Sequence, residues 1–101
     1  MSEKRWADMA IKLPLDARPA IARGMRLQRE PVQDAHVLLY PEGMVKLNRS
    51  AGAIMGRCDG VRTVVDMVAD LERAYNQSGL TGDVLAFVAM AVGGHWLEAR
   101  P

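Results

Sequence analysis

Hydrophobic and polar positions alternate in the first half of the chain. Met25 and Leu27 fall on one side while Arg26 and Gln28 fall on the other, and a period of two is typical of a half-buried strand. Residues 31–35, which begin with a proline, interrupt the pattern. The alternation therefore predicts a first strand that ends before this break.

An aliphatic run, Val37 to Tyr40, follows and ends at Pro41-Glu42-Gly43. A glycine in a three-residue turn adopts positive φ at little cost, so Met44 to Leu47 is expected to pair back as a hairpin. Residues 24–47 thus predict a three-stranded antiparallel meander. One face of such a small sheet must be covered by other elements.

Helical spacing replaces the alternation after this hairpin. Asn48 or Ser50 can cap a first helix of two to three turns, and Asp59-Gly60 offers a glycine stop. Thr63 begins a second helix, because Asp66 three residues later completes a capping-box pattern. The apolar stripe that follows predicts a clearly amphipathic helix.

A third helix is predicted from Thr81, a candidate cap, to Gly93-Gly94, which ends it, and residues 95–99 form a short extended piece. In order, these elements predict an α+β fold: a small winged-helix-like domain with a three-stranded antiparallel meander, three short helices and a short terminal strand. Prolines near the start favour an extended arm. We expect an N-terminal arm at 1–17 and one domain at 18–101.

Composition limits the classes of function. The 101 residues are 50% hydrophobic and 25% charged, which fits one globular domain and excludes disorder throughout. The net charge of +1 is too small to drive non-specific nucleic-acid binding. Residues 1–60 hold ten basic and seven acidic side chains, for +3, and residues 61–101 hold three and five, for −2. The two halves are expected to present different surfaces.

Candidate chemistry is sparse. The single cysteine, Cys58, allows no internal disulfide and no cysteine-based zinc cluster, which favours the cytoplasm. No signal peptide and no run of about 18 apolar residues is recognisable, so no membrane association is expected. His36 and His95 are expected to be structural or exposed, and Cys58 a small buried hydrophobe. We therefore predict no catalytic residue, metal or cofactor, and no enzyme.

Two surface features could serve a partner. The strand Met44–Leu47 is expected at a sheet edge, where its unpaired backbone could accept an extended peptide. Arg18, Arg23, Arg26 and Arg29 form a basic run, for which a solvated face and a patch for an acidic partner remain equal alternatives.

Five fragments together resemble a known family, the pyrroloquinoline quinone (PQQ) biosynthesis protein D family, PqqD. The resemblance covers residues 18–98, and all five fragments stand in the family's order. They are Arg18-Pro19, Arg23-Gly24-Met25-Arg26-Leu27, Val37-Leu38-Leu39-Tyr40-Pro41-Glu42, Val45-Lys46-Leu47-Asn48, and Cys58-Asp59-Gly60 followed by Thr63.

The resemblance implies a non-catalytic, winged-helix-like module that binds the precursor peptide PqqA. The module would present PqqA to the radical-SAM enzyme PqqE, which cross-links a Glu to a Tyr. By the same resemblance the peptide adds as a strand beside the third strand of the meander and lies against the third helix. The implied contacts are Met44, Val45, Lys46 and Leu47 from the strand, and Val84, Leu85, Phe87, Val88 and Ala91 from the helix, about half of which would serve the core alone.

Alternatives remain open. Arg23, Arg26, Asp59 and Gly60 could contact the enzyme or the peptide, although a helix stop is the simpler interpretation of Asp59-Gly60. A homodimer is also compatible with the sequence. A winged-helix DNA-binding module, or another non-catalytic interaction module, is the rival class, but the third helix carries Asp83 and no Lys or Arg.

Overall fold

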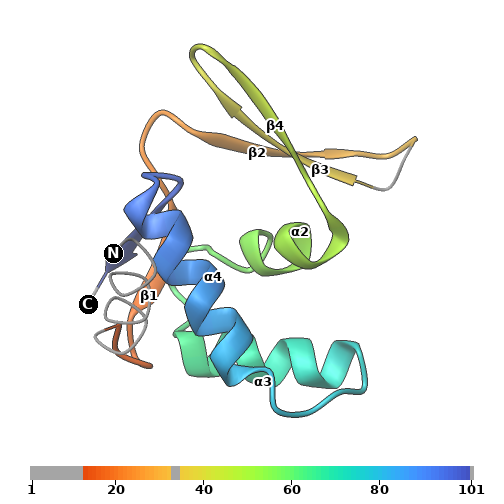
Figure 1. The fold of residues 1–101 in the computed structure, drawn as a ribbon, viewed down its shortest axis with the longest axis vertical. Helices are drawn as coiled ribbons and strands as arrows, with labels where there is room; N and C mark the ends of the chain where they lie inside the picture. Colours follow the sequence, from red (N-terminus) through yellow and green to blue (C-terminus); the bar gives the residue numbers. More distant parts are fainter. Residues whose placement is uncertain (1–12, 33–34, 101) are drawn as a thin grey trace, which may run out of the picture.

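The computed structural model describes residues 13–32 and 35–100. Strands precede and follow a group of helices (Figure 1). The elements are β1 (Arg18–Ile21), β2 (Arg26–Glu30), β3 (Ala35–Tyr40), β4 (Gly43–Leu47), α2 (Arg49–Met55), α3 (Val64–Ala74), α4 (Thr81–Gly93) and β5 (Leu97–Arg100). The small α+β domain with a meander, three helices and a terminal strand is thereby confirmed.

The meander is antiparallel, with the strand order β2-β3-β4. Leu38 in the central strand is opposite Leu27 on one side and Val45 on the other, so these three side chains share one face. Leu38 is fully buried on this face, which packs against the helices below the sheet (Figure 1). Among the described strands, β4 has a neighbour on one side only, as the sequence predicts.

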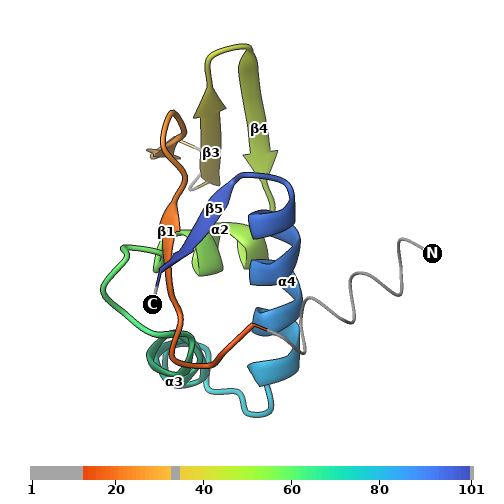
Figure 2. The ribbon, with the colours of Figure 1, turned by 90° about the vertical axis from the view of Figure 1, so that its left-hand side faces the viewer.

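A second sheet was not predicted. β1 pairs with β5 in antiparallel register, from Arg18 opposite Arg100 to Ile21 opposite Leu97, and the two strands cross the domain beside the helices (Figure 2). Just before β1, the carbonyls of Leu15 and Ala17 accept hydrogen bonds from the first backbone N–H groups of α3. Residues 13–17 therefore lie against the body of the domain, while 1–12 fall outside the described residues.

The end of α2 corrects one expectation. Asn48 caps the helix, accepting from the backbone N–H of Ala51 at 2.7 Å, and Ser50 lies inside the first turn. The helix ends at Met55, so Asp59-Gly60 is not its stop. Instead the Asp59 carboxylate accepts hydrogen bonds from the backbone N–H groups of Val61 and Arg62. Gly60 follows Asp59 with φ +76°. This pair shapes the α2–α3 loop.

The starts of the other two helices differ in kind. Thr63 and Asp66 form the predicted capping box at α3. At α4 the prediction of a Thr81 cap is wrong, because Thr81 is the first helical residue and Leu80 precedes it as N-cap without a side-chain bond. The Glu72 carboxylate accepts from the Leu80 N–H at 3.0 Å, so a distant side chain satisfies this helix start. The predicted end at Gly93-Gly94 is confirmed.

The core lies where the sheet face, the three helices and β5 meet. The largest fully buried side chains of this cluster come from every layer of the domain. They are Leu38, Met55, Val64, Met67, Val88 and Leu97. No helix in the described part of the chain has both the length and the apolar character needed to cross a membrane.

Cys58 lies just beyond α2, not on it, and is 5% exposed. Its thiol donates to the Ile54 carbonyl at 3.3 Å, and burial, together with the neighbouring Asp59 charge, raises the pKa of the thiol to about 12. Because the thiolate is the reactive form, we expect the folded protein to resist a disulfide reagent at pH 8. Absorbance should report one reactive thiol only after urea is added; rapid labelling of the folded chain would contradict this burial.

Candidate functional site

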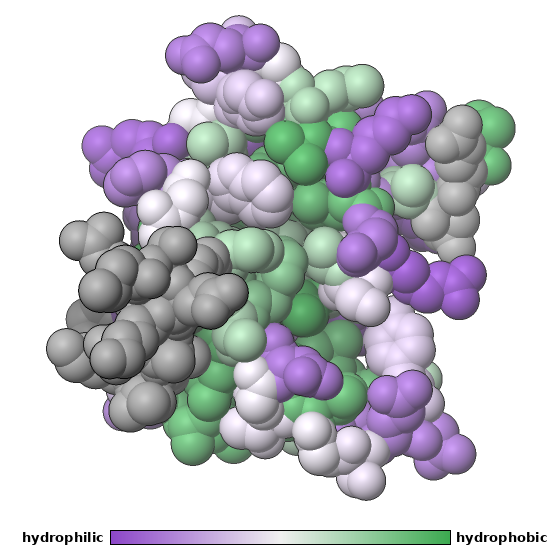
Figure 3. Space-filling view, in the orientation of Figure 1, coloured by the Kyte–Doolittle hydropathy of each residue, from purple (hydrophilic) through white to green (hydrophobic). Residues whose placement is uncertain are grey.

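A groove runs between the edge strand β4 and the helix α4. It has a volume of about 500 Å³ and is open to solvent. We call it the β4–α4 groove; it is lined by Val45, Lys46, Leu47, Asn48, Ser50, Ala51, Ile54, Asp83, Phe87, Met90 and Trp96. The space-filling view shows hydrophobic side chains gathered in the region of α2 and α4, with hydrophilic ones around them (Figure 3).

One face of α4 forms a wall of the groove. Asp83, Phe87 and Met90 line it at positions i, i+4 and i+7, the spacing that places side chains on one helical face. The core stripe of the same helix is shifted by one residue, so that Val84 and Val88 are 2% and 0% exposed. The groove face and the core face of α4 are therefore adjacent stripes.

The residues implied by the family resemblance divide into three groups. Val45, Lys46, Leu47 and Phe87 line the groove. Met44, 55% exposed, and the half-buried Leu85 lie outside it. Val84, Val88 and Ala91 are core residues, each no more than 2% exposed.

Sequence reasoning missed Met90 and Trp96 as groove residues. The signal for Met90 was the i, i+4, i+7 series that begins at Asp83, one residue before the core stripe. Trp96 had no such signal, because the backbone turn that ends α4 positions it: the N–H of Trp96 donates to the Ala91 carbonyl at 2.8 Å, and its carbonyl accepts from Ala22 at 3.0 Å. His95, at φ 65° and exposed, makes this turn.

The free edge of β4 gives the groove a polar rim. Antiparallel pairing with β3 uses one edge of β4, and no other described strand pairs with the opposite edge. A strand edge of this kind can pair with an extended chain, and alternate side chains of that chain would then point into the apolar groove. The arrangement suits binding of a peptide in extended conformation.

The four residues considered as partner contacts lie away from this groove. The side chains of Arg23 and Arg26 are exposed near β2, and the backbone N–H of Arg23 donates to Glu98 at 2.9 Å. Asp59 and Gly60 belong to the α2–α3 loop described above, where Gly60 donates to the Pro19 carbonyl at 2.8 Å. The structural roles of Asp59 and Gly60 are thus defined, while a partner contact stays a prediction.

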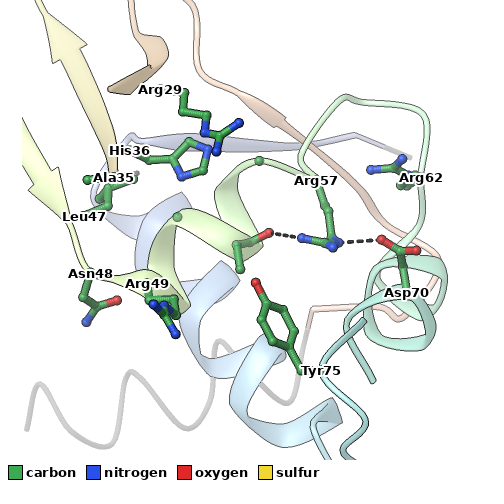
Figure 4. Close-up of a pocket in the computed structure, with 13 residues that line it drawn as sticks. Arg29, Ala35, His36, Leu47, Asn48, Arg49, Arg57, Arg62, Asp70 and Tyr75 are labelled. Carbon is green, nitrogen blue, oxygen red and sulfur yellow. Dashed lines mark hydrogen bonds and ion pairs between the residues drawn. The ribbon is translucent and has the colours of Figure 1, made fainter. Parts of the chain in front are cut away.

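A second, larger hollow of about 750 Å³ lies on the other side of α2 (Figure 4). At its base Arg57 donates to the Asp70 carboxylate at 2.6 Å and to the Ala53 carbonyl at 2.8 Å. The side chain of His36 packs against α2 where Gly52 leaves room. We call this hollow the arginine pocket; it is lined by Arg29, Ala35, His36, Leu47, Asn48, Arg49, Gly52, Ala53, Gly56, Arg57, Arg62, Asp70 and Tyr75.

Gly52 is required by this close packing. A Cβ at Gly52 would lie 2.6 Å from Nδ1 of His36, so we expect Gly52→Ala to lower the free energy of unfolding by about 1–3 kcal/mol. Gly82→Ala in α4 is the matched control, because its Cβ meets nothing within 4 Å and helix propensity then favours alanine. Urea denaturation checks both. Adding His36→Ala should recover stability in the Gly52→Ala variant; equal effects of the two glycine substitutions would contradict the packing.

Two carboxylates carry lowered pKa values. Backbone hydrogen bonds from Arg62 and Val61 lower the pKa of Asp59, and the hydrogen bond from Arg57 lowers the pKa of Asp70. A carboxyl whose pKa is lower in the folded state stabilises the fold above its unfolded pKa and loses that contribution as pH falls through the folded pKa. We therefore expect the free energy of unfolding to decline below about pH 4.

Urea denaturation between pH 7 and pH 3 measures this decline. Asp59→Asn keeps the side-chain acceptor for the loop but cannot titrate, so it should flatten part of the acid dependence. An acid dependence that is identical in wild type and in the Asp59→Asn, Asp70→Asn double variant would contradict the assignment.

Within residues 13–32 and 35–100, no group of three or more His, Cys, Asp or Glu side chains is arranged to hold a metal ion. The fold and the groove instead define a class: a small domain with an exposed strand edge beside an apolar helix face, suited to capture of an extended peptide.

Comparison with known proteins identifies the family. The family model described as Coenzyme PQQ synthesis protein D (PqqD) matches residues 35–97. A protein of Pseudomonas aeruginosa (strain UCBPP-PA14) named PqqA binding protein is 53% identical over 92 residues, which cover 89% of this chain and 100% of the relative. A protein of the same name from Stutzerimonas stutzeri (strain A1501) is 51% identical over 83 residues, 81% and 90% of the two chains. The chain belongs to the PqqD family.

A solved structure agrees with this assignment. The solution NMR structure of the PqqD truncation of Methylobacterium extorquens PqqCD superposes with a TM-score of 0.66 at 32% identity, covering 82% of this chain and 89% of the other. That protein is described as a functional and stand-alone recognition element for ribosomally synthesised and post-translationally modified peptides. The resemblance read from the sequence fragments is thus confirmed at the level of family and fold.

Proposed function

We propose that this chain is a non-catalytic recognition domain of PQQ biosynthesis that binds the precursor peptide PqqA and presents it to the radical-SAM enzyme PqqE. The names of the relatives support PqqA as the ligand. The observation that carries the proposal is the free edge of β4 beside the β4–α4 groove. PqqE as the receiving enzyme follows from the family resemblance.

Binding would proceed by strand addition. The peptide backbone pairs with the outer edge of β4, and this pairing supplies affinity that is independent of side chains. Every second peptide side chain then enters the groove, where Phe87, Met90 and Trp96 offer an apolar surface. Selectivity for PqqA would come from the fit of these side chains.

The domain would perform no chemistry of its own. Cys58 is buried with a raised pKa, and the two carboxylates with lowered pKa values, Asp59 and Asp70, are engaged in a loop and an ion pair. None of these three groups lines the β4–α4 groove. The cross-linking reaction would belong to the enzyme, and the expected location is the cytoplasm.

Isothermal titration calorimetry of the full chain with synthetic PqqA tests the proposal. We expect saturable binding with one peptide per chain, unchanged peptide mass after incubation, and faster cross-linking when PqqE is added with the domain than without it. Duplex DNA should give no heat, since α4 carries no Lys or Arg. Absence of peptide binding at high micromolar concentration, or tighter binding to DNA, would overturn the proposal.

Further partner surfaces remain predictions. Charge-removing substitutions at Arg23 or Arg26 are expected to weaken contact with PqqE if these side chains receive acidic groups. Analytical ultracentrifugation would test the homodimer, which exchange at an exposed strand edge could produce.

A further inference from the structure

The arginine pocket has a marked surplus of positive charge. Besides Arg29, three arginines, Arg49, Arg57 and Arg62, line it, and among the described lining residues Asp70 is the one carboxylate, which leaves these three with a surplus of two charges. This surplus is local, because the whole chain carries only +1. Figure 4 shows that the arginines come from β2, α2 and the α2–α3 loop and surround one hollow.

The one carboxylate is already engaged. Asp70 accepts from Arg57 at 2.6 Å and from Arg73, outside the pocket, at 3.4 Å. Arg62 has only a distant partner, Asp59, at 3.9 Å. The side chain of Arg49 forms no hydrogen bond or ion pair within residues 13–32 and 35–100. Arg49 and Arg62 are therefore cationic groups of the pocket that have at most a distant partner in the described fold.

Arg49 in particular is costly for the fold. It is the first residue of α2, the end at which the helix macrodipole disfavours a cation, and the first turn contains no acidic residue. Its side chain is exposed on the rim shared by the arginine pocket and a smaller hollow near α4. A positive charge at this position does not stabilise the fold, but it would stabilise a bound anionic ligand.

The pocket is continuous with the β4–α4 groove. Leu47 and Asn48 line both hollows, which lie on opposite sides of α2 and meet where β4 passes into this helix. An extended chain paired along β4 would leave the strand edge at this junction. Its next residues would then lie within reach of Arg49.

We propose that the arginine pocket binds an acidic side chain of the same precursor peptide, on the peptide end that lies beside Asn48. This inference rests on the proposed function and deepens it: the recognised pattern is an extended apolar stretch flanked by a carboxylate. Arginine guanidinium groups suit carboxylates because they donate paired hydrogen bonds. Asp83 on the α4 wall repels an anion from the groove itself, so the acidic side chain is directed to the arginine end.

A nucleic-acid ligand fits the same surface less well. Affinity for a phosphate backbone is built from many cationic contacts spread along a strand, whereas these arginines surround one hollow. An isolated carboxylate at the end of a bound strand matches this geometry.

The test is a calorimetric double-mutant cycle between the full chain and synthetic PqqA. On the protein side, Arg49→Gln and Arg62→Gln are made singly and together. On the peptide side, each Asp or Glu is replaced in turn by its amide. Arg100→Gln is the matched control, since it removes the same charge from a side chain of β5 that is 56% exposed and lines neither the arginine pocket nor the β4–α4 groove. Urea denaturation verifies that all variants are folded.

We expect the double variant to bind PqqA about tenfold more weakly, with a smaller dependence of affinity on salt, while Arg100→Gln changes affinity less than about twofold. Neutralising one particular peptide carboxylate should weaken binding to the wild-type protein as much as the double variant weakens binding of unmodified PqqA. The same neutralisation should cause little further loss of affinity when it is combined with the double variant. If wild type binds PqqA and the double variant binds it equally well, this inference fails and the proposed function stands. If the double variant loses binding to PqqE but not to PqqA, this inference is likewise overturned. If the wild-type protein does not bind PqqA at all, both this inference and the proposed function fail.

Discussion

Leu38→Ala is expected to lower the free energy of unfolding by about 2–5 kcal/mol. Leu38 is 0% exposed at the centre of β3, between Leu27 and Val45, on the sheet face that the helices cover. Truncation removes buried methyl groups and leaves a cavity that the rigid sheet cannot close. Since a domain of this size is stabilised by only about 5–15 kcal/mol, urea denaturation will detect the loss as a large shift in midpoint.

Leu39→Ala is the matched control for this substitution. Leu39 is the next residue of β3, and its side chain points to the opposite sheet face, where it is partly exposed. Leu39→Ala should therefore lower the free energy of unfolding clearly less than Leu38→Ala does. Equal losses at Leu38 and Leu39 would contradict the assignment of the core to the helix-covered face.

Phe87→Ala is expected to weaken PqqA binding about tenfold or more. Phe87 lines the β4–α4 groove from the middle of α4, and buried aromatic side chains contribute disproportionately to peptide affinity. Because Phe87 also packs partly against the core, its truncation will lower the free energy of unfolding by about 1–2 kcal/mol. Calorimetry on the folded variant separates the two effects.

Leu85→Ala makes this result specific. Leu85 is half-buried on the same helix and packs against the same core, but it does not line the groove. It should lower stability to a similar extent and leave the affinity for PqqA within about twofold. If Leu85→Ala weakens binding as much as Phe87→Ala, the peptide contacts a different face of α4.

The elements that sequence analysis predicted well are those whose causes are local. Alternation in 24–47 and a tight turn at Pro41-Glu42 produce the meander, and the Thr63–Asp66 capping box lies within four residues. The predicted three-residue turn is wrong in one respect: Gly43 pairs with Tyr40 as the first residue of β4 and does not adopt positive φ, so only two residues connect the strands. β1 escaped prediction because its pairing with β5 joins residues about 80 positions apart. A short strand of this kind, with Pro19 inside it, carries no signal until its partner is known.

The lining of the β4–α4 groove was predicted only in part for a related reason. Spacing along α4 reveals an apolar helix, but nearly every position on it is apolar, so the pattern cannot separate the groove face from the core face. Val84, Val88 and Ala91 were therefore grouped with Phe87, and Met90 was omitted. The arginine pocket depends on packing: Arg29, Arg49 and Arg62 are far apart in sequence and are brought together by α2 and the sheet.

Amide-shift mapping on ¹⁵N-labelled protein during titration with PqqA tests the central claim most directly. Strand addition in the groove predicts that the largest, saturable shifts fall on residues 44–47 of β4 and on Phe87, Met90 and Trp96, with new protection of β4 amides from hydrogen exchange. Shifts centred instead on α3 or on the β1–β5 pair, with β4 unchanged, would contradict the account.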